Sequence, residues 1–229
     1  MLRRTAFLIL GLCALTIADS WSFYGGPWCA KRLTDLAVGM VGNTPVIYGV
    51  NQDYSLVKST DEGQSWTVLM SGLHIRCVAC NPGNADEVYV GLQSGDGGIK
   101  YSTDGGNTWT SLNSGLPATF VPSAIAMRDA QHIVLGLDPL NANDHTIYYW
   151  NVTQWSQSTF PNPNYKGFRV TDLKWDPRSG LEEYIYASSD KSLSDPDYIG
   201  VYQSTNNGVN WVQIGLDFLD ISSIIYTKQ

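Results

Sequence analysis

The sequence predicts an all-β fold: a β-propeller of four-stranded antiparallel blades, with about four recognisable blades and the start of a fifth. The first observation behind this prediction is an eight-residue pattern, S-x-[DN]-x-G-x-x-W, which occurs as STDEGQSW, STDGGNTW and STNNGVNW. Its serines, Ser59, Ser102 and Ser204, lie 43 and 102 residues apart, and a period in this range is typical of stacked or radial repeats. The second observation is that short apolar segments surround each copy, without a helical 3.6-residue stripe. Four-stranded units around a central axis are therefore expected.

The first 20 residues predict a secretory signal. Arg3 and Arg4 form a basic start, Ala6 to Ile17 form an apolar run, and small residues follow at Ala18 and Ser20. The run is short for a membrane span, although an N-terminal anchor helix is the alternative. Residues 21–229 are then one mature propeller domain, which we expect to be secreted, periplasmic or on the cell surface.

Charge excludes two classes of partner. The chain has 14 basic and 21 acidic residues, a net charge of −7, and loss of the two leader arginines makes it −9. Such a surface repels nucleic-acid phosphates and anionic lipids. We expect no nucleic-acid partner and, after cleavage of the signal, no membrane contact.

The cysteines predict neither a metal site nor a cofactor. Cys29, Cys77 and Cys80 would remain after cleavage, and an odd number cannot form a closed set of disulfides. Cys77 and Cys80 lie on a predicted strand, where residues three apart point to opposite faces. Two small buried thiols are expected, with a bridge from Cys29 to one of them left open.

The repeats divide the mature chain into units of about 31–72, 73–117, 118–165 and 166–217, with a partial unit at 218–229. In three of the units the apolar segments predict four strands each. These are 33–40, 46–50, 56–59 and 65–69; then 76–80, 87–91, 98–102 and 108–112; and, in the fourth, 170–175, 184–188, 200–204 and 210–214.

The third unit and the end of the chain depart from the pattern. In the third, 146–150 predicts a strand and Trp155 takes the place of the repeat tryptophan, but the turn between them lacks the Asp and Gly. After the fourth unit, 221–226 resembles the first strand of another. The chain is then either a piece of a longer propeller or one whose last strand closes the ring, and an open edge there could pair with another chain.

Each repeat predicts a hairpin turn between the third and fourth strands. Its Asp or Asn can accept hydrogen bonds from turn N–H groups, its Gly can supply a positive φ, and its Trp can fold back as an apolar plug. We expect Trp155 to lie equivalently to the three repeat tryptophans, all four mostly buried. Because the same residues recur in every unit, we interpret them as structural rather than catalytic. They are Ser59, Asp61, Gly63 and Trp66; Ser102, Asp104, Gly106 and Trp109; and Ser204, Asn206, Gly208 and Trp211.

This pattern resembles the Asp-box, or bacterial neuraminidase repeat, of the sialidase, xyloglucanase and sortilin-like superfamily. The resemblance covers nearly all of the mature chain and implies a propeller whose boxes lie on the outer rim, away from any substrate cleft. The superfamily includes enzymes and non-enzymes. The Arg-Ile-Pro motif that sialidases carry near their start is absent, and nothing else supports Arg32, Arg76 and Arg169 as a sialidase-type arginine triad.

Geometry predicts where a ligand would bind. Loops between the second and third strands share one end of each blade with the blade-to-blade connections, opposite the boxes, and ligands generally bind at such loops. Their short polar and aromatic side chains suit sugar hydroxyls and ring faces, although ordinary solvated loops are the alternative. The candidates are Asp53, Tyr54, His74, Arg76, Asp96, Asp144, His145, Tyr165, Arg169 and Asp190.

Two functions remain open. The sequences RLTDL and RVTDL place Asp35 and Asp172 on innermost strands, and two carboxylates are what glycoside hydrolysis requires. They are weak catalytic candidates, because a structural Thr-Asp or Asp-Arg pairing accounts for them equally. We therefore expect a non-enzymatic binding module for carbohydrate or protein, with a sialidase-type or xyloglucanase-type glycoside hydrolase, or a piece of one, as the alternative.

Overall fold

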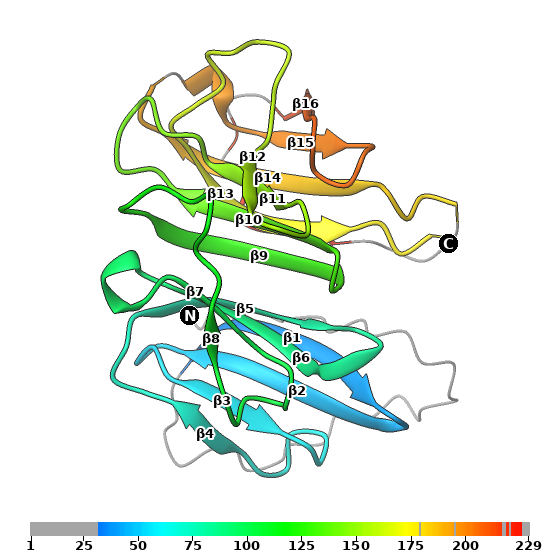
Figure 1. Ribbon diagram of the computed structural model, residues 1–229. Coiled ribbons are helices and arrows are strands. Elements are labelled where there is room, and N and C mark those ends of the chain that lie inside the picture. The colour runs from blue at the N-terminus through cyan, green and yellow to red at the C-terminus, as the bar shows by residue number, and fades with distance from the viewer. Residues whose placement is uncertain (1–31, 179, 195, 217–218, 220, 226–229) are drawn as a thin grey trace, which may run out of the picture.

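The computed structural model describes residues 32–178, 180–194, 196–216, 219 and 221–225. These residues form four antiparallel sheets of four strands each, and every sheet follows chain order. No α-helix occurs among the described residues. Figure 1 shows the sheets succeeding one another in chain order, as blades of a propeller. The predicted fold class is confirmed, whereas the proposed leader, Cys29 and Tyr226 lie outside the described residues.

The strand bounds follow the predicted repeats. Blade 1 holds β1 (Leu33–Val41), β2 (Thr44–Asn51), β3 (Leu56–Ser59) and β4 (Thr67–Met70). Blade 2 holds β5 (Ile75–Asn81), β6 (Asn84–Leu92), β7 (Ile99–Ser102) and β8 (Thr110–Ser111). Blade 3 holds β9 (Val121–Asp129), β10 (His132–Asp138), β11 (Ile147–Trp150) and β12 (Trp155–Gln157). Blade 4 holds β13 (Phe168–Trp175), β14 (Ile185–Ser192), β15 (Val201–Ser204) and β16 (Val212–Gly215). Two short 3₁₀ helices, η1 (Ser94–Asp96) and η2 (Pro196–Tyr198), lie between strands.

The core consists of three apolar clusters, one between each pair of successive blades. Val50 and Val90 represent the cluster between blades 1 and 2, and Ile99 and Leu135 the next. The third joins blades 3 and 4. The first strands β1, β5, β9 and β13 contact one another in that order, so they form the inner wall. A blade buries little apolar surface alone, so stability depends on the neighbours stacked on it.

The three repeat turns form the hydrogen bonds that their residue types predict. Ser59 Oγ accepts from Gly63 N at 2.9 Å, and Asp61 accepts from Ser65 N at 2.8 Å and from Ser65 Oγ at 2.5 Å. Gly63 has a φ of 87°, a conformation in which a Cβ is strained. The second and third turns repeat this network, with Asn206 Oδ1 in the third accepting from Asn210 N at 2.9 Å.

The tryptophans differ more than the sequence predicts. Trp66, Trp109 and Trp211 each donate their indole N–H to the carbonyl of the repeat glycine, at 3.1, 3.0 and 2.8 Å. Trp211 is fully buried, but Trp66 and Trp109 are only half-buried. Trp155 is buried as well, yet its N–H donates to Leu112 O of blade 2 at 2.7 Å. Without a repeat turn of its own, this tryptophan is not equivalent to the other three and joins two blades instead.

The segment 221–225 lies against blade 4 as β5 lies against blade 1. Asp35 Oδ2 on β1 accepts from Val78 N on β5 at 2.8 Å. Asp172 Oδ2 on β13 accepts from Ile224 N at 3.0 Å in the same way. The described part of the chain thus places the start of a fifth unit where the next inner strand belongs, although 221–225 is not itself paired as a strand.

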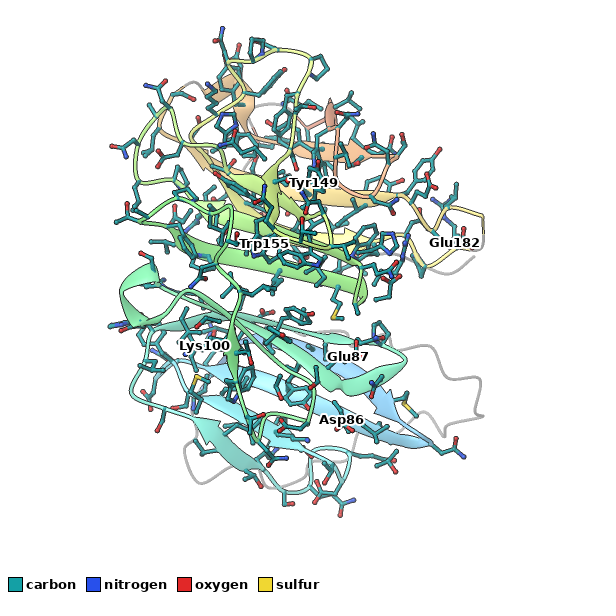
Figure 2. The ribbon with its side chains drawn as sticks, in the orientation of Figure 1. Asp86, Glu87, Lys100, Tyr149, Trp155 and Glu182 are labelled. Carbon is teal, nitrogen blue, oxygen red and sulfur yellow. The ribbon has the colours of Figure 1, made fainter. Side chains whose placement is uncertain are left out.

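The antiparallel order gives the blades two ends. We call one the loop face; its described residues are 52–55, 71–74, 93–98, 112–120, 139–146, 158–167, 193–194 and 196–200. The other is the turn face; its described residues are 42–43, 60–66, 82–83, 103–109, 130–131, 151–154, 176–178, 180–184 and 205–211. The loop face lies on the left of Figure 1 and the turn face on the right. In Figure 2, Asp86, Glu87 and Glu182 lie toward the turn face and Lys100 toward the loop face.

Candidate ligand-binding face

A pocket of ≈ 190 Å³ opens on the loop face of blade 3, beside the connection from blade 2. Its walls are the connection from β8 to β9 and the loop from β10 to β11, with side chains from the ends of β10, β11 and β12. The lining combines apolar rings with short polar groups: Pro117, Thr119, Phe120, Leu137, Asp138, Pro139, Leu140, Asn143, Asp144, His145, Tyr148 and Gln157. The volume is below the usual range for drug-sized ligands, so the pocket suits a single ring or side chain.

Asp144 fixes the loop that forms one wall. Its Oδ2 accepts from Leu140 N and Asn141 N, both at 2.8 Å. Gly167 N also donates to its backbone carbonyl at 2.9 Å, which ties the loop to the entry of blade 4. Short Asp side chains commonly close turns in this way. Asp144 therefore supports the pocket through one carboxylate oxygen and lines it at the same time.

His145 presents an imidazole to this pocket. Partial burial lowers the pKa of His145 from its ordinary value, and the nearby Lys166 lowers it further, against the opposing effect of Asp144. A lowered pKa keeps the ring neutral at pH 7, with one nitrogen as donor and the other as acceptor. Such a ring can hydrogen-bond a hydroxyl in either direction.

A second group, which we call the Arg76 cluster, joins blades 1 and 2 on the same face. It consists of Tyr54, His74, Arg76 and Asp96. Asp96 Oδ2 accepts from His74 N at 3.0 Å and lies 2.6 Å from His74 Nδ1, and these bonds lower the pKa of Asp96. The Tyr54 ring lies 5.4 Å from the His74 ring and 5.6 Å from the guanidinium carbon of Arg76.

Arg76 is the unusual member of this cluster. Its Nε is buried without a hydrogen-bond partner among the described residues. An unsatisfied buried donor costs about 1–3 kcal/mol. Tyr54, which packs against it, has a φ of 60°, an uncommon backbone conformation for a bulky residue. An unpaired buried donor such as Arg76 Nε, next to a strained backbone such as that of Tyr54, is typical of a binding site.

The remaining loop-face candidates are occupied or solvated. Arg169 forms an ion pair with Asp190 through two hydrogen bonds. Tyr165 packs among the rings of Phe160, Tyr198 and Tyr202, and it donates its hydroxyl to Gln213 at 2.9 Å. Asp53 is exposed in the 52–55 turn. The structure thus brings together Tyr54, His74, Arg76 and Asp96, places Asp144 and His145 at the pocket, and leaves the other four elsewhere on the face.

Asp35 and Asp172 hold blades together. Beyond the bonds to Val78 and Ile224, each carboxylate accepts from the N–H of its own next residue, at 2.8 Å for Leu36 and 2.9 Å for Leu173. Burial raises the pKa of Asp35 to about 6 against these bonds, with a smaller raising effect from Asp172. Both oxygens of each carboxylate therefore accept hydrogen bonds from backbone N–H groups.

The two cysteines in the described part of the chain offer no accessible nucleophile. Cys77 and Cys80 are free and buried. Burial raises the pKa of the Cys80 thiol to about 12 and that of Cys77 well above its ordinary value. Thiols in such surroundings are inert. In the described part of the chain, no group of three or more His, Cys, Asp or Glu side chains could hold a metal ion.

Sequence reasoning missed several pocket residues. Phe120, Tyr148 and Gln157 were not candidates, because Tyr148 and Gln157 belong to strands and Phe120 immediately precedes one. Strand residues reach a pocket only when the neighbouring blade leaves space beside them. The one local signal was Pro117, which marks the blade 2 to blade 3 connection as a loop.

Solved structures share this architecture. An ancestral GH74 enzyme is 23% identical over 86% of this chain and 26% of its own, with a TM-score of 0.59. The GH74 xyloglucanase from Xanthomonas campestris is 19% identical over 75% of this chain and 28% of its own, with a TM-score of 0.56. An auxiliary nutrient binding protein from Bacteroides thetaiotaomicron is 12% identical over 82% of this chain and 42% of its own, with a TM-score of 0.55.

These similarities establish a β-propeller fold and nothing finer. The chain spans about a quarter of the length of the two GH74 enzymes and under half of the nutrient binding protein. No protein-family model and no curated protein matches the sequence. Among the described residues, no helix is long and apolar enough to cross a membrane.

Proposed function

We propose that the chain is a non-enzymatic binding module for carbohydrate or protein, secreted or displayed on the cell surface, and that it binds through its loop face. The observation that carries this proposal is the pocket on the loop face of blade 3, where apolar and short hydrogen-bonding side chains meet in one concave site. Ligand sites generally combine these features.

The chemistry of the pocket favours carbohydrate. The buried rings of Phe120 and Tyr148 form an apolar floor, and the amides of Asn143 and Gln157 can donate and accept hydrogen bonds. A sugar ring needs both, because its hydroxyls lie around an apolar face. The Arg76 cluster adds a guanidinium and an imidazole on the same face.

The repeat turns stabilise the fold and are not part of the proposed binding site. We infer that STDEGQSW, STDGGNTW and STNNGVNW are Asp-boxes, since their Ser, Asp or Asn, Gly and Trp residues form one shared hydrogen-bond network. They lie on the turn face, at the other end of the blades from the pocket. Any ligand role is therefore assigned to loops and not to the boxes.

Isothermal titration calorimetry tests the proposal. Residues 21–229 are titrated with xyloglucan oligosaccharides, β-glucan oligosaccharides and sialyl-lactose. We expect weak binding of at least one sugar, reduced about tenfold by Asn143→Ala or His145→Ala, since each removes one hydrogen bond worth about 1–1.5 kcal/mol. Gln64→Ala, an exposed amide on the turn face, is the matched control. Binding that Gln64→Ala weakens as much as His145→Ala does would exclude the loop face.

A glycoside hydrolase is the second candidate, and one observation favours it. Burial raises the pKa of Asp35 to about 6, and a raised pKa is what a general acid requires. The solved structures with a similar fold include GH74 enzymes, but one fold commonly hosts several functions. The backbone bonds of Asp35 weigh against this candidate.

A further inference from the structure

The turn between β11 and β12 carries a sequence motif that lies outside the proposed binding site. Asn151-Val152-Thr153 matches N-x-[ST] without proline, the acceptor sequence for N-linked oligosaccharides. It is the single match in the 229 residues. It also occupies the place where blades 1, 2 and 4 carry their repeat turns, so blade 3 has this motif instead of the box.

The turn presents the motif in an ordered conformation. Asn151 Oδ1 accepts from Thr153 Oγ1 at 2.8 Å, from Thr153 N at 3.1 Å and from Gln154 N at 2.9 Å. Asn151 N donates to Gln154 O at 3.1 Å and closes the loop. The Asn carboxamide and the Thr hydroxyl, the two groups that define the motif, are therefore held side by side.

The acceptor nitrogen is accessible. All four turn residues, 151–154, are exposed, and Val152 at the tip is 59% exposed. Asn151 Nδ2 donates one hydrogen to Ser156 Oγ at 2.7 Å, and its second hydrogen has no protein partner among the described residues. Trp150 and Trp155 stand directly before and after the turn, and Tyr149 and Trp155, labelled in Figure 2, lie within the blade.

We propose that Asn151 is a site of N-glycosylation, an inference that depends on the secreted location proposed above. Asn151 Nδ2 would form a bond to the anomeric carbon of an oligosaccharide carried on a polyprenyl diphosphate. The bond from that carbon to the diphosphate oxygen breaks, the polyprenyl diphosphate leaves, and Nδ2 releases one proton. The remaining Nδ2 hydrogen suffices for Ser156. The sugar would extend from the turn face and leave the loop face open.

The test is secretion of the full chain from insect cells behind an established leader, so that the outcome does not depend on the chain's own first residues. We expect the purified protein to exceed its sequence mass by one oligosaccharide. Peptide N-glycosidase should remove this excess and convert Asn151 to Asp, as read by peptide mass spectrometry. Asn151→Gln and Thr153→Ala should each abolish the excess.

Two matched variants separate the motif from general effects. Thr153→Ser keeps the motif and should retain the oligosaccharide, and Asn164→Gln, at an exposed Asn outside any such motif, should retain it too. Secreted, folded wild type whose Asn151 peptide is unmodified would overturn the proposal. Because calorimetric sugar binding is measured on unglycosylated protein, failure here leaves the proposed ligand binding unaffected, and the reverse also holds.

Discussion

At the scale of single residues, the three repeat tryptophans share a hydrogen bond but not an environment. Trp211 is fully buried between blades 3 and 4, whereas Trp66 is half-buried at the edge of blade 1. Trp211→Ala should lower the free energy of unfolding by about 3–5 kcal/mol, as for other large buried aromatics, and Trp66→Ala by clearly less. Urea unfolding of both variants measures this. Equal losses would mean that the shared turn bond, and not burial, determines the contribution.

The turn acids Asp61 and Asp104 should make the stability of the protein depend on pH. Hydrogen bonds from Ser65 and Ser59 lower the pKa of Asp61 to about 2, and equivalent bonds from Thr108 and Ser102 lower that of Asp104. For an acid whose folded pKa is lowered, stability is present above the unfolded value near 4 and is lost as pH falls through the folded value. In thermal unfolding, the melting temperature of Asp104→Asn should therefore fall less than that of the wild type as the pH is lowered from about 4 to 2.

Asn206 shows why that variant should still fold. In the third turn an Asn already accepts from Ser204 Oγ at 3.0 Å and from Asn210 N at 2.9 Å. Asp104→Ala lacks any acceptor and should unfold at lower urea at pH 7, whereas Asp104→Asn should lie between it and the wild type. An Ala variant as stable as the Asn variant would show that the side-chain acceptor is dispensable.

At the scale of elements, Asp35 couples β1 to β5, and its carboxyl group has a raised pKa. Burial raises its folded pKa to about 6, above the unfolded value near 4. For an acid shifted upward, the contribution to stability is fully present below pH 4 and is lost as pH rises through 6. Asp35→Asn should abolish this component, so urea midpoints from pH 4 to 7 should fall less steeply in the variant. Parallel pH profiles would show that Asp35 is ionised throughout in the folded protein.

The sequence specified elements well and their contacts poorly. Strand alternation and turn residues located the strands of blades 1, 2 and 4 within a few residues, because pleating and turn chemistry are local. In blade 3 they predicted β11 but gave no bounds for β9 and β10. The partners of Asp35 and the pocket beside Phe120 depend on how one blade stacks on the next, which no local pattern encodes. Trp155 illustrates the difference: its burial was expected, but its bond to Leu112 required the neighbouring blade.

At the scale of the whole molecule, the two ends of the blades carry different features. The turn face holds the repeat hydrogen bonds and the Asn151 motif, and the loop face holds the pocket and the Arg76 cluster. Contacts between blades join them side by side, as when Lys58 Nζ of blade 1 donates to Gly105 O of blade 2 at 2.9 Å. Such contacts make the blades one stacked body, so that loops of different blades can present one surface.

The last prediction is that this chain binds sugars without hydrolysing them. A glycosidase needs one carboxyl to give a proton and another to attack the sugar or activate water, so both must face the substrate. Asp35 and Asp172, the inner-strand pair, instead accept backbone N–H groups with both oxygens. Incubation of residues 21–229 with sialyl-lactose, xyloglucan and β-glucan should release no reducing sugar. Turnover that Asp35→Asn or Asp172→Asn abolishes, in protein that circular dichroism shows to be folded under the assay conditions, would establish the enzyme in place of the binding module.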